Sequence, residues 1–458
     1  MTLSLLTKLS GPKLARAKQE SGGRRGLYGV GSALQISPTQ ALLIANRRVV
    51  GEGVIDLEDG ADGFIFDSLD GLERLVSTPL ARNEPGIHPR SGRNLLMVAY
   101  LGSGGFVPLG ARLPNGAPHP AAGTGFAIAT YVGYPAELPE GHPPKGDIHR
   151  FHELIQLRFD GKALRVAERV RFDGAGLIPG RMILNRPINN AIADDDGLVA
   201  ALVGGPMAAG DPGMEGCIAT SHGAGDRALG RNYGCAFCRW RLESSGWRPV
   251  GFVPVSGPDM AFEPSMARDL DGCLLMAVRG QKSKAPPGEQ HDGIENTYHH
   301  FRVYRSADNG RTWRSLLHLP LARSNSPVVL NMTAQGTPFL TANPYNDRAL
   351  RNKLWLWPLS GDRRDVLDPV SVLEGDRHFG RPRPFAPPNE KLDNDWWIDH
   401  PIGAAVCLGD GRWHNLLCFR VTDAAAHMTR QEPPPQAGLW IEEVADSLEG
   451  ERAPWSLE

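Results

Sequence analysis

Polar residues that stand directly before a proline recur along this chain, and their side chains could carry acid–base chemistry on an anionic ligand. Each pair leads into a short apolar stretch and then a turn that contains glycine. The residues before the prolines are His88, Arg186, Glu263, Ser326 and His400. A carboxyl group, imidazoles and a guanidinium gathered in one place can move protons and pair with a carboxylate. We expect these side chains to converge, because they occupy the same position in a repeated pattern.

The chemistry of each residue suggests its role. Arg186 is expected to hold a substrate carboxylate or sulfate through its planar fork. Glu263 follows Phe262, and we expect its carboxyl group to have a raised pKa, because burial favours the neutral acid. The expected catalytic residues are Glu263, His88, Asp399 and His400. The expected substrate-binding residues are Arg186, Ser326, Asn325, Trp397 and His149, with Trp397 stacking on a sugar face.

Each of these assignments has a structural alternative. A charged residue at such a position can simply be a solvated residue on the rim of the fold. Arg186 can form an ion pair with Glu263 or Asp399 instead of binding a ligand. Trp397 can pack between repeated units instead of contacting a sugar.

The elements that must position these residues are short strands joined by tight turns. Asp-Gly pairs that are typical of hairpins recur along the chain, for example Asp196-Gly197, Asp271-Gly272 and Asp410-Gly411. A polar residue, a proline and a turn repeated at this spacing favour radial repetition of four-stranded units. We therefore predict an all-β fold, a β-propeller of four-stranded antiparallel blades, with six blades expected and five or seven as alternatives. The competing interpretation is that X-Pro and Asp-Gly are common in any all-β protein.

The segment Ser306-Ala-Asp-Asn-Gly-Arg-Thr-Trp313 predicts one specific turn between strands. Ser306, Asp308 and Thr312 can satisfy backbone groups of a tight hairpin. Gly310 supplies a positive φ, and Trp313 packs under the turn where the next strand begins. We expect these five residues to be structural.

This segment resembles the Asp-box, or BNR repeat, of the sialidase-like β-propeller superfamily, which includes sialidases and propeller-type polysaccharide lyases. In that superfamily the box joins the third and fourth strands of a blade, away from the catalytic pocket. The resemblance implies a carbohydrate-active enzyme, a sialidase-like exo-glycoside hydrolase that cleaves a glycosidic bond of an acidic, carboxylated sugar. It also implies Arg186 and Glu263 in the site, with Arg279 and Arg420 as further arginines.

Two alternatives to the hydrolase stay open. The first is a polysaccharide or oligosaccharide lyase, in which His or Tyr removes the proton next to a uronate carboxylate in a β-elimination. The second is a propeller that binds carbohydrate without catalysis.

The expected domain organisation is an N-terminal extension over 1–25 and one propeller domain over 26–458. A long segment at 102–150 is dense in Gly and Pro, and we expect it to be a loop insertion that forms a lid or wall over the axial pocket. The pair Cys235 and Cys238 has the spacing of a metal knuckle, but no second pair exists, so a buried strand is expected instead of a zinc or redox site.

Composition limits the partners. The chain has 49 basic and 51 acidic residues, so its net charge of −2 does not favour a nucleic-acid partner. No apolar run is long enough for a membrane span, and the first residues lack the order of a secretory signal. We expect a cytoplasmic protein, or an exported one whose signal is absent from this chain. A carbohydrate substrate is the expected partner. No cofactor is expected, with a structural Ca²⁺ as the alternative. The sequence does not determine the oligomeric state.

Overall fold

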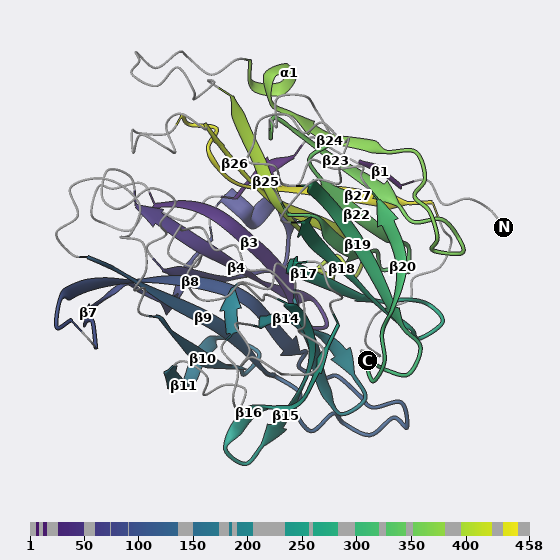
Figure 1. The fold of residues 1–458 in the computed structure, drawn as a ribbon. Coiled ribbons are helices and arrows are strands. Elements are labelled where there is room, and N and C mark those ends of the chain that lie inside the picture. Colours follow the sequence, from purple (N-terminus) through teal and green to yellow (C-terminus); the bar gives the residue numbers. More distant parts are fainter. Residues whose placement is uncertain are drawn as a thin grey trace.

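In the described part of the chain, antiparallel strands form six sheets arranged around a common centre (Figure 1). In this computed structural model the described residues are 6–8, 12–15, 26–49, 60–73, 75–89, 91–135, 150–173, 183–185, 190–204, 234–255, 260–282, 298–319, 327–344, 351–380, 395–423 and 434–447. The helical elements among them are η1, a 3₁₀ helix over Leu69–Glu73, and α1 over Gly375–Phe379. None of the described helices is long and apolar enough to cross a membrane.

Three sheets have four strands each, and we name every sheet by its inner strand. The β3 sheet contains β3 (Gly26–Ser37), β4 (Gln40–Val49), β5 (Ala61–Phe66) and β6 (Ser77–Ala81). The β17 sheet contains β17 (Met260–Arg268), β18 (Leu274–Lys282), β19 (Tyr298–Ser306) and β20 (Arg314–Leu319). The β21 sheet contains β21 (Val329–Met332), β22 (Pro338–Ala342), β23 (Lys353–Pro358) and β24 (Val370–Glu374).

The other three sheets carry additional short strands. The β8 sheet contains β8 (Asn94–Val107), β9 (Thr124–Pro135), β10 (Arg150–Phe159) and β11 (Leu164–Asp173), with β7 (Glu84–Ile87) on the free edge of β8. In the β13 sheet, β12 (Ile183–Asn185) and β13 (Ile192–Asp194) both pair with β14 (Gly197–Gly204), followed by β15 (Gly234–Glu243) and β16 (Gly246–Pro254). The β25 sheet contains β25 (Trp396–Cys407), β26 (Trp413–Asp423) and β27 (Gly438–Asp446).

The inner strands, with β14 in place of the short strand β13, touch one another in a closed circle. β3 contacts β8, β8 contacts β14, and β14 contacts β17, which contacts β21; β21 contacts β25, and β25 returns to β3. The expected all-β propeller of four-stranded antiparallel blades is confirmed. Because the chain runs outward through each sheet and then returns to the centre, the inner strands all begin at the same end of the axis.

The N-terminal segment closes this circle. Within the range expected as an extension, β1 (Leu6–Lys8) and β2 (Lys13–Leu14) both pair with β27, so residues from the two ends of the chain share the β25 sheet. Leu6 is buried against apolar residues of the β21 and β25 sheets. The ring is therefore held closed by backbone hydrogen bonds and apolar packing.

Apolar packing joins each sheet to the next. The six largest hydrophobic clusters each draw their residues from two neighbouring sheets. Between the β8 and β13 sheets, for example, the rings of Phe126 and Trp240 lie 4.4 Å apart. Burial of apolar surface, at about 25 cal/mol per Å², is the main source of stability for such interfaces.

The segment 102–150 is not the long loop that its glycines suggested. Its first residues continue β8 to Val107, and 124–135 form β9, so the expectation of a loop over this range is wrong. Several of these glycines allow close packing instead. A Cβ on Gly125 would lie 2.3 Å from the carbonyl oxygen of Gly105, and a Cβ on Gly105 would lie 2.6 Å from Ala191. Residues 136–149 lie outside the described part of the chain.

The turn over 306–313 has the interactions that its sequence indicates. It joins β19 to β20, the third and fourth strands of their sheet. Asp308 accepts hydrogen bonds from the hydroxyl groups of Ser306 (2.7 Å) and Thr312 (2.6 Å), and Thr312 lowers the pKa of Asp308 to about 2. The indole of Trp313 donates to the carbonyl oxygen of Gly310 at 3.1 Å, and Gly310 has φ 86°.

A related turn in the next sheet was missed from the sequence. After β23, the hydroxyl group of Ser360 donates to Asp362 at 2.7 Å and accepts from the amide of Asp365 at 3.0 Å. Arg363 has φ 62° and stands at the position of Asn309, which has φ 56° in the turn over 306–313. Without the glycine and the tryptophan, this segment gives no clear signal in the sequence.

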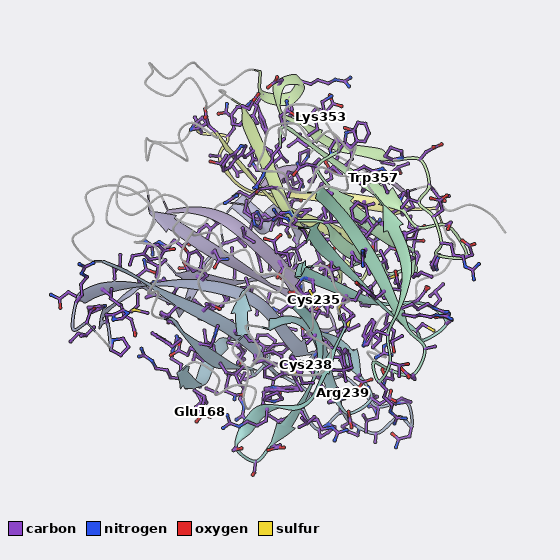
Figure 2. All side chains as sticks on the ribbon, viewed as in Figure 1. Glu168, Cys235, Cys238, Arg239, Lys353 and Trp357 are labelled. Atoms are coloured by element: carbon purple, nitrogen blue, oxygen red, sulfur yellow. The ribbon has the colours of Figure 1, made fainter. Side chains whose placement is uncertain are left out.

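The Cys235 and Cys238 pair does not form a joint site. Both side chains are buried on β15 (Figure 2), and they belong to hydrophobic clusters on opposite faces of the sheet. Residues three apart in a strand point in opposite directions, so their sulfur atoms cannot share a metal ion. Burial raises the pKa of Cys238, which keeps its thiol neutral.

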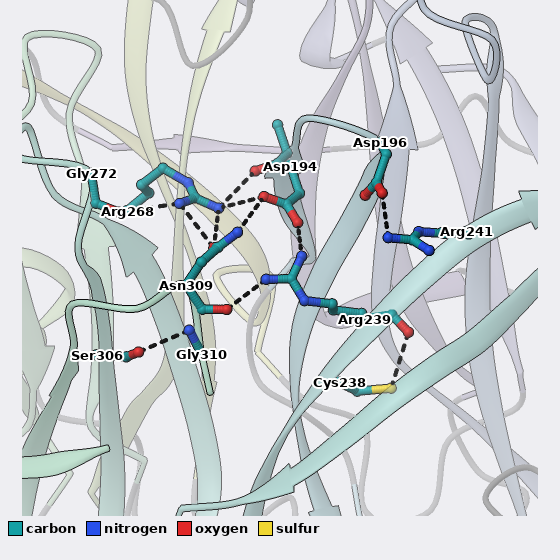
Figure 3. Close-up of polar contacts among 11 residues, drawn as sticks. Asp194, Asp196, Cys238, Arg239, Arg241, Arg268, Gly272, Ser306, Asn309 and Gly310 are labelled. Carbon is teal, nitrogen blue, oxygen red and sulfur yellow. Dashed lines mark hydrogen bonds and ion pairs between the residues drawn. The ribbon is translucent and has the colours of Figure 1, made fainter. Parts of the chain in front are cut away.

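At the end of the axis where the inner strands finish, an ionic network joins the β13 and β17 sheets (Figure 3). Asp194, at the end of β13, accepts from Arg268 at 3.1 Å and also from Arg239. Its third donor is the side-chain amide of Asn309 at 3.2 Å, in the turn over 306–313. This carboxylate therefore ties together three strands and a turn from two sheets. Asp196 lies in the same hairpin and forms an ion pair with Arg241, and both partners are about half exposed.

We expect Asp194→Ala to lower the free energy of unfolding by about 1–3 kcal/mol, because it leaves two partly buried arginines without their shared carboxylate. Asp196→Ala is the matched control, and its exposed ion pair predicts a change within about 0.5 kcal/mol. Urea denaturation followed by tryptophan fluorescence measures both. Equal effects of the two substitutions would contradict a joining role for Asp194.

Candidate active site at the bulges of the inner strands

Four inner strands carry a β-bulge, which lies near the start of β3, β17 and β25 and midway along β8. The register shifts lie between Tyr28 and Gly31, Leu101 and Gly104, Phe262 and Ser265, and Asp399 and Ile402. At each bulge two residues of the inner strand stand opposite one residue of the second strand. Bulges redirect side chains and are frequent beside active sites.

Glu263 and His400 occupy the same position, the first residue of their bulges. Both precede a proline, and both have positive φ values, 51° and 53°. The corresponding residues in β3 and β8 are Gly29 and Gly102. A positive φ is uncommon for residues with side chains and is disfavoured before proline, so it costs roughly 1–3 kcal/mol at each site. Strain of this kind concentrates where function requires it.

The prolines do not mark the start of the inner strands in the β17 and β25 sheets. Pro264 and Pro401 lie inside β17 and β25, several residues after each strand begins. A bulge leaves a residue unpaired in the ladder, which is why a residue without an N–H group is tolerated there.

Glu263 is held by an arginine of the second strand. Its Oε2 accepts a hydrogen bond from Nη1 of Arg279 at 2.7 Å, and both side chains are buried. Burial lowers the pKa of Arg279, and the charge of Glu263 opposes this effect. The ion pair favours the ionised form of Glu263, whereas the sequence suggested a neutral acid.

Asp399 is fully buried and surrounded by cations. Arg420 binds it through two hydrogen bonds, from Nε to Oδ1 at 2.8 Å and from Nη2 to Oδ2 at 2.9 Å. Arg351 donates to Oδ2 through Nη1. Although burial acts to raise the pKa of Asp399, Arg420, His400 and Arg351 hold it well below its usual range. Asp399 is therefore ionised and cannot supply a proton at neutral pH.

His400 lies in front of this carboxylate. Its Nδ1 is 2.9 Å from Oδ1 of Asp399, and its side chain is 13% exposed. Burial lowers the pKa of His400, and Asp399 opposes this effect. The imidazole is therefore mostly neutral near pH 7, the form that accepts a proton.

These residues form one electrostatic unit, which we call the bulge cluster: Glu263, Arg279, Arg351, Asp399, His400 and Arg420. The charge of Glu263 acts on His400, and the charges of Arg351 and Asp399 act on Arg279. Within the cluster, three arginines face two carboxylates while the imidazole is neutral. The cluster therefore has one surplus positive charge, which suits an anionic ligand.

Three of the four residues expected to be catalytic meet in the bulge cluster: Glu263, Asp399 and His400. His88 lies elsewhere, in the turn between β7 and β8, where its Nδ1 accepts from the amide of Ser91 at 3.1 Å. At this place the proline and the glycine mark a hairpin turn, and the bulge of β8 comes later in the strand.

The expected substrate-binding residues are only partly described. Trp397 is half-buried, and the guanidinium of Arg351 lies 5.1 Å from the centre of one of its rings. Stacking of Trp397 on a sugar stays a prediction. Arg186, Ser326, Asn325 and His149 lie outside the described residues, so their roles also stay predictions.

Arg351 could not be recognised from the sequence as a residue of the site. It stands before β23, outside the repeated proline pattern, and reaches Asp399 only because the β21 and β25 sheets are neighbours. Arg279 and Arg420 were both expected near the site. In the structure each lies opposite the residue that precedes a bulge, Phe262 and Asp399 respectively. Among the described residues, no group of three His, Cys, Asp or Glu side chains is placed to hold a metal ion.

Comparison with known proteins supports the fold. No protein-family model matches the sequence, and no curated protein matches it. A protein of unknown function from Dyadobacter fermentans aligns with a TM-score of 0.52 and 11% identity, over 96% of this chain and 98% of that chain. At this identity the likeness shows a shared fold and nothing about activity.

Two further solved structures have lower scores. A sialidase of Trypanosoma rangeli in complex with the inhibitor DANA has a TM-score of 0.49 and 11% identity, over 97% of this chain and 60% of that chain. An α-L-arabinanase of Penicillium chrysogenum complexed with arabinobiose has a TM-score of 0.45 and 11% identity, over 96% of this chain and 98% of that chain.

Proposed function

We propose that the protein is a carbohydrate-active enzyme that cleaves a glycosidic bond of a carboxylated sugar, with the bulge cluster as its active site. The observation that carries this proposal is the pair Glu263 and His400. Each is a strained residue before a proline, at the same position of its inner strand, and each lies beside buried arginines. Strain at two matching positions is hard to explain by folding alone.

The charge balance supports an acidic substrate. The surplus positive charge of the bulge cluster would attract a sugar carboxylate, and a site screened from water strengthens that attraction. Arg186 remains the residue that we propose for direct pairing with this carboxylate. A neutral sugar would gain nothing from this field.

His400 supports elimination as the reaction. A neutral imidazole can remove the proton from the sugar carbon next to the carboxylate. The electron pair of that C–H bond then forms a carbon–carbon double bond, the bond to the leaving oxygen breaks, and that oxygen takes up a proton. The products are an unsaturated uronate and a new hydroxyl group.

Hydrolysis is the second candidate, and Glu263 favours it. An ionised carboxylate held by Arg279 could activate a water molecule or attack the anomeric carbon, as in an exo-acting glycoside hydrolase. Binding without turnover is the third outcome, and it would leave the strain at His400 unexplained.

The reaction can be tested with uronate-containing and sialylated oligosaccharides. We expect turnover of at least one class, and the ultraviolet absorbance of an unsaturated uronate would identify elimination. New reducing ends without that absorbance would identify hydrolysis. We expect His400→Gln to lower kcat by about 10²–10⁴-fold, because it removes the proton-transfer group.

His414→Gln is the matched control, since His414 is a buried histidine of the same sheet whose ring nitrogens face Glu443 and Asp410. We expect it to keep its kcat. Full activity of the His400→Gln protein would remove the basis of the proposed function.

The pH profile tests the state of His400. The base is active when neutral, so activity falls as the pH drops through the pKa of His400. Because burial lowers that pKa, we expect the acid limb of kcat/KM to lie below the ordinary histidine value of 6.5. The charges that act on the imidazole are those of Asp399, Arg420 and Glu263. An acid limb above 6.5 would show that another group controls the rate.

A further inference from the structure

We infer that Asp399, Arg420 and Arg351 form a positioning clamp that holds His400 in one tautomer, with a proton on Nδ1 and none on Nε2. Its catalytic consequence rests on the function proposed above, because it assigns which nitrogen of His400 transfers the proton. Arg351 and Arg420 thereby act through Asp399, without contacting the substrate.

Asp399 has no position left to accept a further hydrogen bond. A carboxylate has about four positions at which it accepts hydrogen bonds. Oδ1 faces Nε of Arg420 and Nδ1 of His400, while Oδ2 faces Nη2 of Arg420 and Nη1 of Arg351. Four donors therefore occupy the two oxygens, and His400 fills the last position.

The hydrogen between Asp399 and His400 belongs to the imidazole. Arginine groups only donate, and an ionised carboxylate only accepts. The contact at 2.9 Å between Asp399 and His400 is therefore a hydrogen bond in which Nδ1 carries the hydrogen. In a neutral imidazole the other nitrogen then has a free electron pair. Among the described residues, Nε2 of His400 has no hydrogen-bond partner, so this electron pair is available to a substrate.

Arg420 and Arg351 are themselves held in place by neighbouring strands. Arg420 lies opposite Asp399 in the register of β25 and β26, and its Cδ packs against Gly29 of the β3 sheet, where an added Cβ would come within 3.4 Å. The carbonyl oxygen of Arg351 accepts from the amide of Ile398 at 2.8 Å. Its guanidinium lies over Trp397, so three consecutive residues, 397–399, contact Arg351.

The opposite tautomer of His400 would have a higher free energy in this geometry. With the proton on Nε2, the electron pair of Nδ1 would face a buried carboxylate, and both groups would be acceptors without a hydrogen between them. Repulsion at 2.9 Å inside a poorly solvated site would then displace the imidazole. The clamp thus selects one tautomer by electrostatics alone.

The inference is tested on the full-length protein by NMR of ¹⁵N-labelled histidine, with the signals of His400 identified by their loss in His400→Gln. We expect a protonated Nδ1 and an unprotonated Nε2 in the wild type at neutral pH. In Asp399→Asn the arginines would hold the amide oxygen and the amide nitrogen would face His400, so we expect the tautomer to invert. A wild-type signal with the proton on Nε2 would overturn the inference. This measurement needs no substrate and no turnover.

Kinetics separate a positioning role for Arg351 from direct substrate binding. We expect Arg351→Gln to lower kcat about tenfold with KM within about twofold of the wild type, since it weakens the support of Asp399 and not a ground-state contact. A rise in KM of about tenfold or more, with kcat and the tautomer unchanged, would overturn the assignment of Arg351 to the clamp.

The matched control is Arg363→Gln. Arg363 follows β23 of the same sheet and forms an ion pair with Asp269 through two hydrogen bonds, at 2.9 and 2.8 Å. We expect the loss of this pair to leave kcat, KM and the His400 signals unchanged. If no acidic sugar is turned over, the proposed function fails, while the NMR result still decides whether the clamp exists.

Discussion

The buried charge of Asp399 is the constraint on which the candidate site depends. Removing a carboxylate from water costs several kcal/mol even after the protein relaxes, so such a group persists only where cations and hydrogen bonds compensate it. Arg420 supplies most of this compensation from the neighbouring strand, and Arg351 adds to it from the next sheet. These contacts determine how β25, β26 and the segment before β23 lie relative to one another. They thereby also determine the orientation of His400. The orientation of one imidazole is thus a consequence of how a single charge is buried.

The closed ring makes this arrangement tolerable. Two bulge residues with positive φ cost roughly 1–3 kcal/mol each, a sizeable fraction of the 5–15 kcal/mol by which most domains are stable. The opposing free energy comes from elsewhere in the fold. Apolar clusters join each sheet to the next, and polar links such as Asp194 hold the far end of the axis. Pairing of β1 with β27 keeps the first and last parts of the chain from separating. The free-energy cost of the strained residues at one end of the axis is therefore offset by packing along the whole ring.

The sequence predicts those features that local patterns determine. The propeller, the turn over 306–313, and the convergence of Glu263 and His400 follow from turn residues and from repeated prolines. Features that depend on packing were not accessible. Gly104 and Gly105 were interpreted as loop residues because nothing local distinguishes a flexible glycine from one that permits close contact. His88 fits the proline pattern, but in the structure that pattern marks a hairpin. Arg351 reaches Asp399 across a boundary between sheets, and no spacing in the sequence encodes that contact.

The two matching bulges show why one of them is better suited to proton transfer. In both sheets an arginine of the second strand lies opposite the residue that precedes the bulge. In β17 that residue is Phe262, which offers no charge, so Arg279 pairs with the bulge residue Glu263 itself. In β25 the residue is Asp399, which binds Arg420, and among the described residues the bulge residue His400 is hydrogen-bonded through Nδ1 alone. The residue before the bulge is a phenylalanine in β17 and an aspartate in β25. This difference decides whether the strained bulge residue itself forms the ion pair with the arginine. These contacts support our proposal that His400, and not Glu263, transfers the proton.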